Sequence, residues 1–132
     1  AYLGPMTIRY AHAPDIEAQV RRIAAALGLA HIDERVVCMR STGSRARRTL
    51  ARCHALPRIM QAALGVPAHY VIEILSEPFD RLSGEERTKT LIHELLHVPR
   101  AFGGGLKSHR CVNRRAVQKL YEVYVRRLRE RG

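Results

Sequence analysis

Two histidines and a glutamate in one short segment are the residues of this sequence best suited to chemistry. His93 and His97 stand four residues apart, so on a helix they share one face and can bind the same metal ion. Glu94 is turned by about 100° from His93. It therefore lies outside the ligand pair but within reach of a water on the metal. The pattern His-Glu-x-x-His predicts metal-assisted hydrolysis, with Glu94 as the general base.

A catalytic zinc ion needs a third protein ligand and an open position for water. His109 follows His97 by twelve residues. Pro99 would end the helix, and three consecutive glycines would let the chain turn back toward the metal. We expect one Zn²⁺ per chain, with His109 completing the set begun by the two histidines of the motif. Cys111 and Glu122 are the alternative third ligands.

The reaction expected at such a site is hydrolysis of a peptide bond. Glu94 would take the proton of the zinc-bound water and pass it to the leaving amine, while zinc polarises the scissile carbonyl. Tyr121, Tyr124 and Arg110 are candidates for a second oxyanion donor or a substrate contact. His54 could line the cleft or orient a ligand, although a structural or surface role is favoured.

Hydrophobic periodicity and turn residues predict a single α+β domain spanning residues 1–132. A small three-stranded mixed sheet is expected, together with an N-terminal helix, a buried helix that carries the motif and a long C-terminal helix. The helices are expected at 14–29, 58–64, 83–98 and 110–131, and the strands at 35–40, 49–56 and 68–75. One turn of helix is the alternative for residues 49–56. An extended peptide could pair with the strand that precedes the motif helix.

The start and end of the motif helix follow from its sequence. Ser83 can cap the helix by accepting from the amide three residues later, and Glu86 can reach back toward the cap. Pro99 requires the helix to end near Val98. Apolar residues flank both histidines, so this helix is expected to be buried almost all round.

The composition is strongly basic. The chain has 23 basic and 12 acidic residues, a net charge of +11. Such a balance favours contact with polyanions, nucleic acid above all. The alternative to a peptidase is therefore a DNA- or RNA-binding module with a structural metal and no protease activity. Its phosphate contacts would come from exposed arginines: Arg45, Arg47, Arg48, Arg114, Arg115, Arg126, Arg127, Arg129 and Arg131.

Three cysteines, Cys38, Cys53 and Cys111, form no Cys-x-x-Cys pair. Their odd number argues against a disulfide framework and for a reducing, cytoplasmic location. No apolar run approaches the length of a membrane span, so no membrane partner is expected.

The segment from Ile74 to Pro78, followed by the motif helix, resembles the SprT-like metallopeptidases. The chain is more similar still to a set of small archaeal and bacterial zinc metallopeptidases with the pattern His-Glu-Leu-Leu-His-x-Pro, then Phe and glycines, then His. Pro99, Phe102 and His109 match that pattern. The resemblance implies a zincin fold, zinc bound by the three histidines and Glu94 as the base. Eukaryotic SprT-like proteases cut proteins crosslinked to DNA, and a basic chain would suit such substrates. No Cys-x-x-Cys zinc ribbon follows the catalytic part here.

Overall fold

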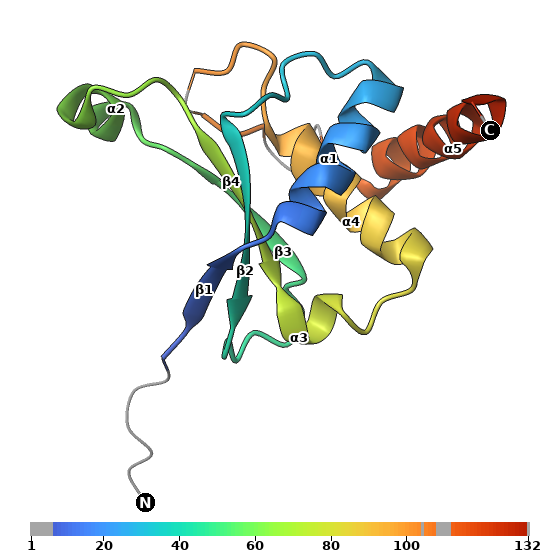
Figure 1. The fold of residues 1–132 in the computed structure, drawn as a ribbon, viewed down its shortest axis with the longest axis horizontal. Helices are drawn as coiled ribbons and strands as arrows, with labels where there is room; N and C mark the ends of the chain where they lie inside the picture. Colours follow the sequence, from blue (N-terminus) through green and yellow to red (C-terminus); the bar gives the residue numbers. More distant parts are fainter. Residues whose placement is uncertain (1–6, 104, 108–111, 132) are drawn as a thin grey trace, which may run out of the picture.

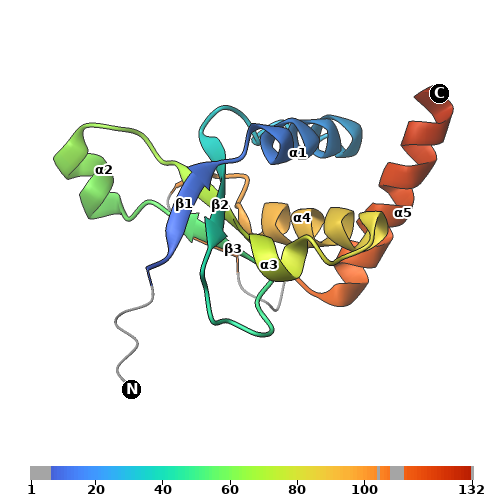
Figure 2. The same ribbon diagram turned by 60° about the horizontal axis from the view of Figure 1, so that its bottom comes forward.

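The computed structural model describes residues 7–103, 105–107 and 112–131. Within them the fold is α+β, with four strands and five helices in the order β1, α1, β2, β3, α2, β4, α3, α4, α5. The strands form one mixed sheet, and α1, α4 and α5 lie on the same side of it (Figure 1). Helix α2 projects away from the sheet and from these helices (Figure 2).

The sheet has the strand order β1-β2-β4-β3. Its centre is the parallel pair of β2 (Val36–Thr42) and β4 (Tyr70–Leu75). The outer strands, β1 (Arg9–His12) and β3 (Ala51–Ala55), pair antiparallel with β2 and β4. The prediction of three strands is therefore wrong by one. β1 has four exposed residues and no alternation of apolar and polar side chains, so only its pairing with β2 reveals it.

The core lies between the sheet and the helices on its covered face. Alternate residues of β4 point into it, and Tyr70, Ile72 and Ile74 are fully buried there. Helix α1 (Pro14–Leu27) contributes a stripe that includes Val20 and Ile23, and α4 (Gly84–His97) contributes Leu91, Ile92 and Leu95. This packing holds α4 rigidly against the sheet, which positions the motif.

Helix α1 begins at the predicted residue and ends two residues before the predicted end. Pro14 occupies the first turn, where its missing amide hydrogen costs no hydrogen bond, and Asp15 follows it. Gly28 ends the helix in the left-handed conformation at φ 68°. The predicted continuation to residue 29 overshoots by two residues.

Other predicted elements are present with shifted ends. β2 continues to Thr42 instead of ending at residue 40, and α2 (Arg58–Leu64) has the predicted bounds. The segment after β4 forms a short helix, α3 (Ser76–Phe79). Helix α5 (Arg114–Arg131) begins four residues later than predicted, because the side chain of Asn113 caps it by accepting from the amide of Ala116 at 2.9 Å.

Candidate metal centre and active site

Helix α4 carries the His-Glu-x-x-His motif, and its ends are those predicted. The amide of Glu86 donates to Ser83 Oγ at 3.2 Å, while the Glu86 carboxylate accepts from the same hydroxyl at 3.4 Å. The helix ends at His97, followed by Val98 in an extended conformation and Pro99. Its first turn is exposed, so the prediction of burial all round holds only for its C-terminal half.

The two histidines of the motif face each other across one turn of α4. Nε2 of His93 lies 3.2 Å from Nε2 of His97, with the rings inclined at 70°. Two nitrogens bound at about 2.0–2.1 Å to a tetrahedral zinc ion lie about 3.3 Å apart. The separation observed here is therefore the one that a shared zinc ion requires.

The ring of His97 is oriented by the chain that follows α4. Its Nδ1 lies 2.6 Å from the main-chain oxygen of Lys107. A carbonyl only accepts, so Nδ1 carries the hydrogen and donates it. In the neutral ring, Nε2 then has the lone pair that a metal requires, and it is the nitrogen that faces His93.

The described part of the loop from residue 98 to 107 is fastened to the body at several points. Phe102 is 9% exposed, and its ring packs edge-on against Tyr70 with the guanidinium of Arg35 4.0 Å from its centroid. The hydroxyl of Tyr70 donates to the main-chain oxygen of Gly105 at 2.7 Å. Phe102 itself adopts φ 52°, a conformation that non-glycine residues rarely take. These contacts hold the loop in place at the described residues.

Glu94 lies against the core and is 6% exposed. Burial raises the pKa of its carboxyl from 4.5 to about 7, because the charged form loses hydration. Its Oε1 lies 4.0 Å from His93 Nε2. A carboxyl group beside the paired imidazoles, with a pKa near neutrality, is suited to accept and return a proton.

An open cleft of about 600 Å³ runs past His93 and Glu94. Its walls come from the start of β3 with the loop before it, from one face of α4 and from the first turns of α5. The lining residues are Arg48, Thr49, Leu50, Ala51, Glu86, Lys89, Thr90, His93, Glu94, Arg114, Val117 and Gln118.

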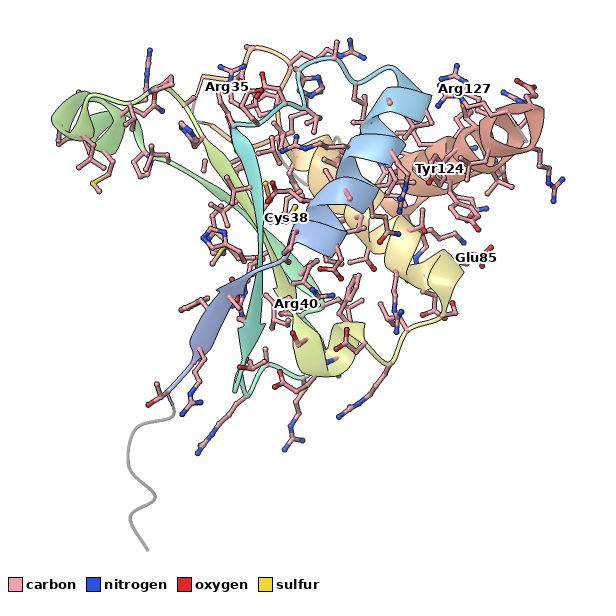
Figure 3. All side chains as sticks on the ribbon, viewed as in Figure 1. Arg35, Cys38, Arg40, Glu85, Tyr124 and Arg127 are labelled. Atoms are coloured by element: carbon pink, nitrogen blue, oxygen red, sulfur yellow. The ribbon has the colours of Figure 1, made fainter. Side chains whose placement is uncertain are left out.

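Several predicted site residues fall elsewhere. His109, Arg110 and Cys111 lie outside the described residues. Tyr124 is buried in the core and Tyr121 is half-buried, and neither is among the cleft-lining residues. Burial, together with the nearby Glu85 carboxylate, raises the pKa of Tyr121. Glu85 stands at the start of α4 (Figure 3), which places Tyr121 two turns from the histidines.

Glu122, an alternative ligand, is exposed on α5, and its carboxylate accepts from Gln118 at 3.1 Å. No group of three or more His, Cys, Asp or Glu side chains in the described part of the chain is placed to hold a metal ion. Any third ligand must therefore come from the residues beyond it or from a rearrangement.

His54 lies on β3 but outside the cleft. Alternate residues of β3 pack on the core, so His54 and Arg52 point to the other face of the sheet. There His54 Nε2 contacts Glu73 Oε1 at 2.7 Å, and the hydroxyl of Ser41 donates to Glu73 Oε2 at 2.6 Å. These partners account for a carboxylate that is only 4% exposed. The role favoured from sequence, a structural or surface histidine, agrees with this arrangement.

The sequence predictions did not place Lys89, Arg48 or Arg114 beside the motif, and named the two arginines only as possible phosphate contacts. Lys89 and Thr90 precede His93 by four and three residues, so helical spacing alone could have placed them on its face. Arg48 and Arg114 belong to distant segments. No local pattern brings them to the same cleft.

The family comparison agrees with this geometry. Residues 8–127 match the family model described as "Putative phage metallopeptidase", a range that includes the whole motif and every wall of the cleft. No curated protein and no solved structure matches the chain. In the described residues, no helix is both long enough and apolar enough to cross a membrane. The match covers far more than half of the sequence, and the chain therefore belongs to this phage metallopeptidase family.

Proposed function

We propose that the protein is a zinc-dependent metalloendopeptidase of zincin type, related to the SprT-like enzymes, with one zinc ion per chain. The observation that carries the proposal is the 3.2 Å separation of His93 Nε2 and His97 Nε2 on one face of α4. Two imidazole nitrogens at this distance fit a tetrahedral zinc ion. Imidazole ligands with an adjacent carboxyl base are also the donor set of zinc peptidases.

His109 is the third ligand in this proposal. The chain two residues before it is tied to the motif, since Lys107 exchanges hydrogen bonds with His97 in both directions: its amide donates to His97 O at 2.8 Å and its carbonyl accepts from His97 Nδ1. Two residues span at most about 7 Å. We choose His109 because it follows Lys107 by only two residues in the sequence, whereas Cys111 follows it by four and Glu122 is exposed on α5.

Each residue of the site has its own role in the proposed reaction. When bound, zinc supplies Lewis-acid activation of a water molecule and of the scissile carbonyl. Glu94 accepts a proton from the attacking water and returns it to the leaving amine nitrogen, for which a pKa of about 7 is well matched. Lys107 holds the His97 ring in its ligating tautomer. Arg110 remains the candidate for a second oxyanion donor.

The substrate is a protein or peptide bound in extended form. We expected this peptide to pair with β4, which is separated from α4 only by the short α3. However, β4 lies between β2 and β3 and is hydrogen-bonded on both sides. That expectation is wrong. β3 is an outer strand of the described sheet. The main chain of Leu50 and Leu56 bonds toward β4, so the alternating pattern turns the main-chain groups of Ala51 and Cys53 outward. These groups can pair with a peptide beside the cleft.

Zinc content and hydrolysis test this proposal together. Protein purified without chelators is expected to contain about one zinc per chain and to cleave unfolded protein substrates. Glu94→Gln is expected to retain zinc and lose at least about a hundred-fold in kcat/KM. Glu130→Gln, a matched change at an exposed site far along α5, is the control. Absence of zinc, or a Glu94→Gln variant as active as the wild type, would refute the proposal.

The nucleic-acid-binding module remains the alternative, and no contact of the described residues favours it. Among the arginines on which it depends, Arg127 donates to the main-chain oxygen of Ala26 and thus fastens α5 to α1. Arg45, Arg47 and Arg48 are exposed on the loop before β3. Salt-dependent DNA or RNA binding, without hydrolysis by zinc-loaded protein, would favour this alternative.

A further inference from the structure

The cleft that passes His93 and Glu94 is lined by more basic than acidic groups. Arg48, Lys89 and Arg114 supply three positive charges. Glu86 and Glu94 supply at most two negative charges. The cleft is therefore net positive at the site where we propose that a substrate binds.

The two arginines of the cleft are exposed and directed to solvent rather than to protein carboxylates. Within the described residues, the guanidinium groups of Arg48 and Arg114 make no hydrogen bond or ion pair, and both side chains are exposed. Other arginines are paired, as Arg40 is with Asp15 at 2.6 Å and Arg35 with Asp33 at 2.8 Å. The cleft arginines thus have all their donors available to a ligand.

Lys89 contributes less than the arginines. Its ammonium lies 3.6 Å from a Glu85 carboxylate oxygen and 5.0 Å from the centroid of the Tyr121 ring. Both contacts compete with a substrate for its charge. Its position is informative nonetheless. Four residues of helix separate it from His93, about 6 Å along the axis, which is about two residues of an extended peptide.

We propose that the cleft selects peptide segments with Asp or Glu about two residues from the scissile bond, on the side that lies over the N-terminal half of α4. The proposal rests on the peptidase function and names its substrate class. Arg48 and Arg114, from the loop before β3 and the start of α5, bind the acidic side chains together with Lys89, whose position on α4 sets the two-residue spacing, and the outer edge of β3 pairs with the peptide main chain.

The lining favours a peptide over a nucleic acid. No tyrosine or phenylalanine is among the cleft-lining residues, so the described walls offer no platform for stacked bases. Thr49 and Leu50 lie between Arg48 and β3. Ala51, the first residue of β3, turns its main-chain groups away from β4. This wall ends in the edge of β3 that pairs with no other strand of the described sheet, and such an edge is suited to an extended polypeptide.

Binding measurements on a variant without the catalytic base test this inference independently of the catalytic proposal. The affinity of Glu94→Gln protein is measured by fluorescence anisotropy for three labelled peptides that differ at one position: Glu, Gln or Lys. At 50 mM NaCl the Glu peptide is expected to bind about 3- to 10-fold more tightly than the Gln peptide and more tightly still than the Lys peptide. The difference should shrink at 500 mM NaCl.

Charge-matched variants locate the effect. In the Glu94→Gln background, Arg48→Gln with Arg114→Gln is expected to abolish the preference for Glu. Arg22→Gln with Arg58→Gln removes the same charge from exposed sites outside the cleft and is expected to keep it. Equal loss in both double variants would mean that only net charge matters, and it would overturn the proposal.

Three further outcomes have definite meanings. A DNA or RNA oligonucleotide that displaces the Glu peptide and binds more tightly at 150 mM NaCl would overturn the proposal, because the cleft would then bind nucleic acid. If zinc-loaded wild-type protein hydrolyses no peptide but the Glu preference in binding persists, the peptidase function fails while the acidic ligand class is upheld. Hydrolysis without any preference for Glu over Gln would refute the inference alone.

Discussion

His97 and Lys107 are joined by two reciprocal hydrogen bonds, from His97 Nδ1 to Lys107 O at 2.6 Å and from Lys107 N to His97 O at 2.8 Å. The pair closes a ten-residue loop onto the end of α4. It directs Nε2 of His97 toward His93 and returns the chain to the motif just before His109. Lys107 thus connects the two described candidate ligands, His93 and His97, to the expected third ligand, His109.

Lys107→Pro should weaken zinc binding, because proline has no amide hydrogen to donate to His97 O. Groups that orient a metal ligand typically contribute 10- to 100-fold in affinity, so about a ten-fold rise in the zinc Kd is expected. Competition with a chromogenic chelator measures it. Lys107→Ala keeps both main-chain hydrogen bonds and should bind as the wild type does. Equal affinities in the two variants would show that the loop closure is irrelevant to the metal.

His109→Ala should lower the zinc affinity by at least about a hundred-fold, since a catalytic zinc site loses one of its three protein ligands. Glu122→Ala removes the exposed carboxylate of α5 and should leave the affinity unchanged. Elemental analysis after dialysis measures both. Full zinc occupancy in the His109 variant would shift the third ligand to another residue, and zinc loss in the Glu122 variant would identify it.

Ser41→Ala should destabilise the protein by about 1–2 kcal/mol at pH 7, because the hydroxyl donates to the buried Glu73 carboxylate at 2.6 Å. Burial raises the pKa of Glu73, but the hydrogen bonds from Ser41 and His54 outweigh it and hold that pKa below 4.5. Ionised Glu73 therefore contributes stability above pH 4.5 that is lost as the pH falls through its folded pKa.

The destabilisation by Ser41→Ala should accordingly be largest above about pH 5 and shrink below about pH 4. Urea unfolding across this pH range measures it. Ser44→Ala is the control, since its hydroxyl accepts from the Ala46 amide and contacts no carboxylate of the described residues. A pH-independent cost would mean that Ser41 acts by packing alone.

Cys38 and Cys53 should resist alkylation in the folded protein. Burial raises the pKa of each thiol to about 12, so only about one molecule in ten thousand carries the reactive thiolate at pH 8. Iodoacetamide labelling followed by peptide mapping should be slow in native protein and fast in urea. Equal rates would contradict the burial of these thiols. The reducing location predicted from the cysteines stays a prediction.

Much of the motif helix was predictable because its determinants are local. Ser83 caps it, Pro99 ends it, and a spacing of four residues aligns His93 with His97. These features depend on hydrogen bonds and on a helical period within residues 83–99, so they can be read from the local sequence. The α+β class followed in the same way from the periodicity of α1, β2 and β4.

Pairing between distant segments was not predictable by the same means. β1 has no apolar alternation and exists only through its bonds to β2, and β4 lies inside the sheet although it precedes α4 with only the short α3 between them. The order of strands depends on contacts that no local pattern encodes.

The sequence by itself determined that His93, Glu94 and His97 lie on one helix, with the two histidines as possible metal ligands and the glutamate as a possible base. Only the tertiary structure decided the environment of these groups. Packing against the sheet buries Glu94 and raises its pKa, Lys107 orients His97, and Arg48 and Arg114 line the same cleft. Desolvation and charge depend on neighbours in space, and chain folding brings those neighbours together from remote positions.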